Sequence, residues 1–184
     1  TGELMAPRGT MAEDEAIALF SERIRALVDG GADLILIETM SDLAESRAAI
    51  AAAKAVAAEL PIVATMSFDT NLRTMMGVTP TAAVHALAEA GADAVGANCG
   101  RGPEEMIRIA AELVAARGAD DSVLLVAQSN AGLPQVQGDA FAYTVDPPAM
   151  GAHAQELREA GIDLIGACCG SSPEHIRAIA TALN

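Results

Sequence analysis

The chain has 184 residues, of which 52% are hydrophobic but only 2% aromatic, and its formal net charge is −14. This length suits one domain whose sizeable core is built from aliphatic side chains. The acidic balance argues against nucleic acid and against an anionic membrane as partners, because both require basic patches.

Five short apolar runs bounded by turn residues are typical of buried parallel strands. They cover residues 33–38, 61–68, 93–99, 122–128 and 163–169. Amphipathic segments around them predict helices over 12–29, 43–58, 80–90, 103–117, 147–160 and 173–183. This alternation predicts an α/β fold with a parallel sheet. None of the apolar runs is long enough to cross a bilayer.

Three of the predicted strands are preceded by similar helix-to-strand connections, namely "DGGADLI", "EAGADAV" and "EAGIDLI". Such connections are typical of a (β/α)8 TIM barrel. Five strands do not close that barrel, so we expect either an open doubly wound sheet or an incomplete barrel. We treat residues 1–184 as one domain. The loop-like opening at Thr1 suggests a fragment or a processed chain, and an incomplete barrel is expected to self-associate or to take strands from a partner.

All three cysteines lie in two copies of one strand–turn–helix pattern. The copies are "GADAVGANCGRGPEEMIRIAAEL" from Gly91 and "GIDLIGACCGSSPEHIRAIATAL" from Gly161. Parallel strands deliver their carboxyl ends to one rim, so Cys99 should meet Cys168 and Cys169 there. Three thiolates on one rim form a zinc site with an open fourth position. The alternative, in which each cysteine is a small buried hydrophobe, stays open because no CxxC pair is present.

The stretches "GANCG" and "GACCGSSPEHI" resemble the two cysteine motifs of the homocysteine S-methyltransferase family. "DLILIET" (33–39) and "SNAGLP" (129–134) are also similar, the latter especially to the homocysteine-binding modules of cobalamin-dependent methionine synthases. The resemblance covers essentially the whole chain as strands four to eight of a TIM barrel. It implies zinc-dependent transfer of a methyl group to the homocysteine thiol, which forms methionine.

The resemblance also assigns residues. It implies that Cys99, Cys168 and Cys169 bind Zn²⁺ and that Glu38 holds the homocysteine amino group. Asn98 and Asn130 are candidates for orienting the metal ligands or the substrate through hydrogen bonds. The sequence departs from the family where "GACCGSS" replaces the commoner "GGCCGT", and where the first three strands, which help to enclose homocysteine, are absent.

The methyl donor stays open among methylcobalamin, a betaine and a methylsulfonium compound. The "SNAGLP" resemblance favours methylcobalamin carried on another domain or protein. With three cysteines, no even disulfide set and no signal peptide, we expect a cytoplasmic protein.

Two other functions compete with this interpretation. One is a metal-free, phosphate-binding barrel isomerase or aldolase that uses the helix N-termini near residues 102 and 172. The other is a non-catalytic, zinc-binding barrel fragment.

The histidines lie on predicted helices, away from the strand ends, and are interpreted as surface or packing residues: His85, His153 and His175.

Overall fold

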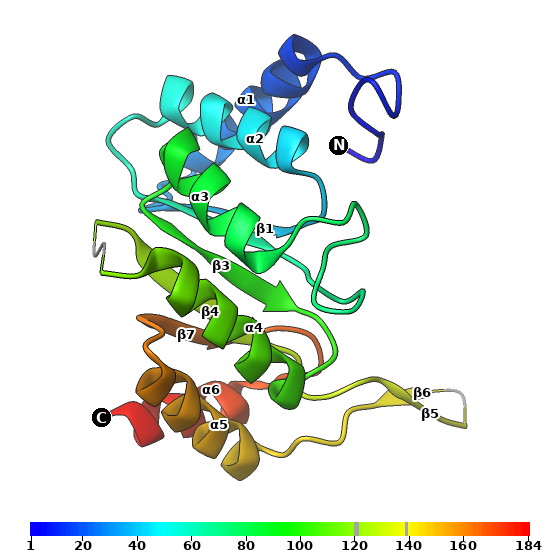
Figure 1. Ribbon diagram of the computed structural model, residues 1–184, viewed down its shortest axis with the longest axis vertical. Coiled ribbons are helices and arrows are strands. Elements are labelled where there is room, and N and C mark those ends of the chain that lie inside the picture. Colours follow the sequence, from blue (N-terminus) through cyan, green and yellow to red (C-terminus); the bar gives the residue numbers. More distant parts are fainter. Residues whose placement is uncertain (120–121, 139) are drawn as a thin grey trace.

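The computed structural model describes residues 1–119, 122–138 and 140–184. Its main sheet has five parallel strands in the order β1-β2-β3-β4-β7 (Figure 1). These are β1 (Ile35–Met40), β2 (Ile62–Met66), β3 (Ala94–Cys99), β4 (Leu124–Ser129) and β7 (Leu164–Ala167). Each predicted strand is present, with its ends shifted by a few residues, and the predicted parallel α/β fold is confirmed.

Within the residues that the structure describes, six helices accompany the sheet, close to the predicted ranges. Several begin with a side-chain cap: Thr79 accepts a hydrogen bond from the Ala82 N–H and Asp146 accepts one from the Ala149 N–H. The helices are α1 (Glu13–Asp29), α2 (Leu43–Val56), α3 (Pro80–Ala90), α4 (Pro103–Arg117), α5 (Pro147–Ala160) and α6 (Pro173–Leu183).

One face of the sheet packs against helices and forms the main hydrophobic core. Alternate strand residues such as Ile37, Val95 and Leu125 are buried in this core together with helical residues such as Ile50 and Leu113. Because side chains alternate along a strand, the neighbouring positions face the other way. The core therefore uses only one of the two faces of the sheet.

The opposite face carries exposed leucines. Leu36, Leu124 and Leu164 are 40%, 44% and 41% exposed. Leu36 lies between the buried Ile35 and Ile37, and Leu124 lies between the buried Val123 and Leu125. In the sheet order β1 and β7 are the two edges, so each pairs on one side only. The five strands thus form an open, half-covered sheet, as expected for part of a barrel.

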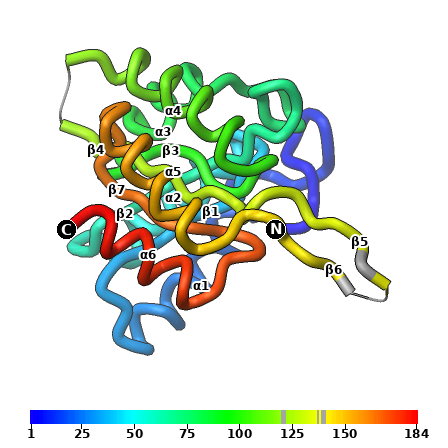
Figure 2. The backbone as a smooth tube through the Cα atoms, turned by 90° about the horizontal axis from the view of Figure 1, so that it is seen from below, coloured from blue at the N-terminus to red at the C-terminus, as the bar shows by residue number. Residues whose placement is uncertain are grey.

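The long connection after β4 contains a small hairpin that the sequence did not predict. Strands β5 (Gln135–Gln137) and β6 (Ala140–Ala142) pair in antiparallel fashion. The hairpin extends away from the body of the molecule in both views (Figure 2).

Within the described part of the chain, no helix combines the length and the apolar character needed to span a membrane.

Candidate metal centre

The sheet order brings the two cysteine motifs to one rim. Strand β4 lies between β3 and β7, and Cys99 at the end of β3 is paired in register with Ser129 at the end of β4. Cys168 and Cys169 follow directly after β7. The Cys168 N–H donates to the Ser129 carbonyl over 2.8 Å, which fixes the second motif beside the first. The predicted convergence of the strand ends is confirmed.

The three sulfur atoms form a compact cluster. The Sγ atom of Cys169 lies 3.8 Å from that of Cys99 and 3.9 Å from that of Cys168. All three sulfur atoms lie within 4.8 Å of one another. A tetrahedral zinc with Zn–S bonds of about 2.3 Å requires sulfur atoms about 3.8 Å apart. Two of the three separations match this value, so the donor set fits zinc, which Cys99, Cys168 and Cys169 would hold.

The cluster is accessible from one side. Cys169 is exposed, while Cys99 and Cys168 are half-buried. The pKa of the Cys169 thiol is raised to about 11, first by desolvation and then by repulsion from, and hydrogen bonding with, the neighbouring sulfurs of Cys168 and Cys99. Three thiolates at this spacing repel one another, so the cluster calls for a cation to hold all of them ionised.

Unusual backbone conformations shape the two motifs. Cys99 has φ = 68°, which is uncommon for a residue other than glycine, and Gly100 follows it with φ = 74°. Gly170 has φ = 80°, and a Cβ atom there would lie 2.1 Å from the ring of Tyr143. The glycines after the cysteines therefore permit the close turn and the close packing that the motifs need.

Asn130 joins the two motifs. It is 5% exposed; its Nδ2 donates to the Gly100 carbonyl over 2.7 Å, and its Oδ1 accepts the Cys169 N–H over 2.9 Å. Both ends of this amide are thus used within the protein, one on each cysteine loop.

Asn98 is buried just before Cys99 and is also hydrogen-bonded within the protein. Its partners are Thr39 on β1, Thr65 on β2 and the Cys168 sulfur. Sequence reasoning singled out both asparagines but not the threonines. The only signal for Thr65 was a polar residue inside an apolar strand.

Glu38 lies near the carboxyl end of β1, on the same rim of the sheet, and is exposed. Its carboxylate forms no hydrogen bond or ion pair with the residues that the structure describes. It is therefore free to receive a cationic group.

The histidines lie outside the thiol cluster. His153 is 5% exposed and its Nε2 lies 2.7 Å from the Ser129 hydroxyl. His175 is 8% exposed; its Nδ1 accepts the Ser172 N–H and its Nε2 lies 3.0 Å from the Val145 carbonyl. The interpretation of the three histidines as surface or packing residues is confirmed, because His153 and His175 are buried and His85 is exposed.

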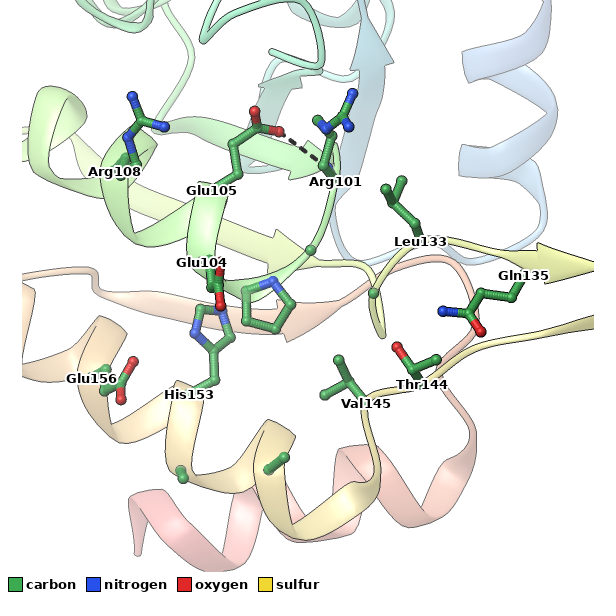
Figure 3. A pocket seen from close by; sticks show the side chains of 15 residues that line it. Arg101, Glu104, Glu105, Arg108, Leu133, Gln135, Thr144, Val145, His153 and Glu156 are labelled. Atoms are coloured by element: carbon green, nitrogen blue, oxygen red, sulfur yellow. Dashed lines mark hydrogen bonds between the residues drawn. The ribbon is translucent and has the colours of Figure 1, made fainter.

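A groove of about 710 Å³ lies between the N-terminal parts of α4 and α5. Figure 3 shows Arg101 and Glu105 on the α4 side and His153 and Glu156 on the α5 side. The Nδ1 atom of His153 is buried without a hydrogen-bond partner among the described residues. The described lining residues include no cysteine, so this groove is separate from the thiol cluster.

The fold and the cluster together define a class of protein, in which parallel strands of an α/β sheet deliver three thiols to one rim. The chain belongs to the homocysteine S-methyltransferase family, whose sequence profile it matches over residues 1–183.

Two relatives are methionine synthases. The chain is 31% identical over 169 residues to that of Mycobacterium leprae and 32% identical over 169 residues to that of Mycobacterium tuberculosis. Each match covers 89% of this chain but only 14% of the relative. The chain thus spans a small part of the length of these methionine synthases.

The homocysteine methyltransferase MmuM from Escherichia coli has a similar fold. Its apo form superposes with a TM-score of 0.72 at 22% identity, covering 94% of this chain and 58% of MmuM. The metallated form gives the same TM-score and identity, and this chain covers 52% of it. At this identity the likeness concerns the fold, which is that of part of a TIM barrel.

Proposed function

We propose that this chain binds zinc through Cys99, Cys168 and Cys169 and serves the transfer of a methyl group to the thiol of homocysteine, which yields methionine. The observation that carries the proposal is the set of three sulfur atoms within 4.8 Å of one another on one rim of the sheet. Membership of the homocysteine S-methyltransferase family supports the substrate. A metal-free phosphate site would leave this cluster without a role.

Different residues of the protein bind the thiol end and the amino end of homocysteine. When bound, zinc supplies a Lewis acid that favours the thiolate form of a sulfur ligand. The exposed side of Cys169 leaves room for that sulfur. The Glu38 carboxylate, on the same rim, pairs with the substrate ammonium group and so orients the amino acid.

The chemical step is a displacement at carbon. The homocysteine thiol loses its proton to solvent water, and a sulfur lone pair attacks the methyl carbon while the bond from that carbon to the donor breaks. The donor keeps the bonding electron pair, and the product is a thioether. The contribution of the chain is to hold the sulfur and the amino group so that the sulfur meets the methyl group in line.

The methyl donor is proposed from the relatives. The two methionine synthases extend far beyond the part that this chain matches. The "SNAGLP" segment supports methylcobalamin, delivered by another domain or protein, ahead of a betaine or a methylsulfonium compound.

We also propose that residues 1–184 form the C-terminal portion of a TIM-barrel domain. Two features support this: the exposed leucines on the uncovered sheet face, and the edge strands β1 and β7. Further β/α units would cover the leucines and pair with the edge strands. The same features favour self-association of the chain when it is purified alone.

The test is homocysteine binding to the zinc-loaded chain, measured by titration calorimetry, followed by assays of methionine formation with each of the three donors. We expect binding in the native chain and its loss in Cys168→Ser, with Met75→Ala as a matched control because Met75 is 74% exposed. A zinc-loaded chain that does not bind homocysteine would contradict the proposal.

A further inference from the structure

A β-bulge lies at the end of β1, where the candidate ammonium partner is found. Ile37 pairs with Ala64 and Met40 with Met66, so β1 has one residue more than β2 over this stretch. The extra residue falls at Glu38 and Thr39. Ile37 and Met40 both pack in the helix-covered core, which leaves Glu38 and Thr39 between them. Bulges of this kind redirect side chains at the rims of sheets.

The bulge depends on a residue in an unfavourable conformation. Thr39 has φ = 61°, in the left-handed region that β-branched residues rarely adopt. Such a conformation persists only where its surroundings hold it. Thr39 follows Glu38 directly, so whatever holds Thr39 also determines where the Glu38 carboxylate is presented.

Asn98 holds Thr39 at two points. The Thr39 N–H donates to Asn98 Oδ1, and Asn98 Nδ2 donates to the Thr39 hydroxyl, each over 2.7 Å. The Thr65 hydroxyl also donates to Oδ1 over 2.7 Å. Because the backbone N–H of Thr39 can only donate, the oxygen of the amide must face it. The amide orientation is therefore fixed, and the NH2 group faces Thr39 Oγ1 and the metal site.

The same NH2 group reaches the thiol cluster. Asn98 Nδ2 lies 3.6 Å from Cys168 Sγ and donates to it. Asn98 is 1% exposed, so its amide makes these bonds from a buried position. Donors to a ligand sulfur and other contacts outside the ligand set orient metal ligands and adjust their affinity for the metal. The buried Asn98 amide thus contacts both Thr39, next to Glu38, and Cys168 in the thiol cluster.

We propose that Asn98 is a positioning residue that couples the thiol end of the site to the amino end: it orients Cys168 and, by holding Thr39 in the bulge, sets Glu38 at the distance that homocysteine spans. This inference rests on the proposed function. It differs from a role in substrate contact, because the amide is already occupied by protein groups.

The test compares two ligands that differ only in the amino group. Homocysteine and 4-mercaptobutyrate share the thiol, the chain length and the carboxylate, so the ratio of their dissociation constants reports on the Glu38 subsite. In the native chain we expect homocysteine to bind about tenfold more tightly, as a single ion pair allows. In Asn98→Ala, loaded with zinc, the ratio should fall to about two, as in Glu38→Gln.

Two further variants separate the two ends. Asn98→Asp keeps an oxygen for the Thr39 N–H but lacks the NH2 donor, so zinc affinity measured against a chromophoric chelator should fall about tenfold while part of the ligand ratio survives. If Asn98→Ala does not fold, this variant carries the test. Thr65→Val is the matched control: it removes one bond to Oδ1, leaves both Thr39 bonds, and should retain the native ratio.

The outcomes are distinct. A native chain that binds neither ligand, or binds both equally, contradicts the proposed function. A native chain that prefers homocysteine, together with Asn98→Ala and Asn98→Asp variants that keep the full ratio and the full zinc affinity, overturns the role of Asn98 alone. The double variant Glu38→Gln, Asn98→Ala should lower the ratio no further than Glu38→Gln does.

Discussion

The sulfur atoms of Cys99 and Cys169 lie 3.8 Å apart although 70 residues separate them in the chain. The pairing of β3 and β7 on either side of β4 is what brings them together. The separation equals that of two ligands of one tetrahedral zinc. The two cysteine motifs therefore contribute to one thiol cluster.

Removal of a sulfur should weaken zinc binding strongly. We expect Cys169→Ser and Cys99→Ala each to lower zinc affinity on the order of a hundredfold or more, because a thiolate ligand is lost outright. Competition with a chromophoric chelator measures this. Met75→Ala serves as the control at a distant, exposed position. Native affinity in Cys169→Ser would mean that this residue is not a ligand.

Glu38→Gln should weaken the binding of homocysteine and leave the binding of zinc unchanged. The change removes the charge that pairs with the homocysteine ammonium group, so KM should rise about tenfold while zinc content stays at the native level. Steady-state kinetics with metal analysis of the same sample checks both. Glu59→Gln, at an exposed site before β2, is the control for a general charge effect. An unchanged KM would remove Glu38 from the site.

Asn130→Ala should lower the affinity of the three cysteines for zinc. The variant loses the bond to the Gly100 carbonyl and leaves the Cys169 N–H without its partner. We expect zinc affinity to fall about 10–100-fold, as is typical for residues that orient metal ligands. Chelator competition measures the affinity, and circular dichroism shows whether the fold is kept. A variant with native affinity would show that the two loops hold their positions without this amide.

His153 should make stability depend on pH. Burial lowers its pKa to about 4, from 6.5 in the unfolded chain. Between these values the unfolded state binds more protons, so stability is full above pH 6.5 and is lost as the pH falls toward 4. Through this group alone, a change from pH 7 to pH 5 should cost about 2 kcal/mol.

Urea unfolding at pH 7 and at pH 5 tests the His153 effect. The difference between the two pH values should shrink by that amount in His153→Gln and stay unchanged in His85→Gln, because His85 is exposed. An equal pH dependence in the native chain and in His153→Gln would exclude His153 as its source.

The sheet and the thiol cluster were predictable from sequence because each depends on a repeated local pattern. Continuous apolar runs marked the strands, and cysteines at the ends of two of them had to share a rim once the strands were parallel. The β5–β6 hairpin was not predictable, because its two strands are three residues long each and lie in a segment rich in turn-forming residues.

The hydrogen-bond partners of Asn98 were also beyond sequence reasoning, which offered this residue only as a candidate for orienting the metal ligands or the substrate. An asparagine at a strand end is an ordinary turn residue, and its partners Thr39 and Thr65 lie on two other strands. Their contact depends on the register of three strands and on the bulge in β1. No local pattern encodes that combination.

Zinc content with thiol titration, on the purified native chain, tests the central claim most directly. The account predicts about one zinc per chain, with all three thiols protected from a thiol reagent until a chelator removes the metal. A chain without zinc that also takes up none from solution, with three thiols that react freely both before and after chelation, would contradict it.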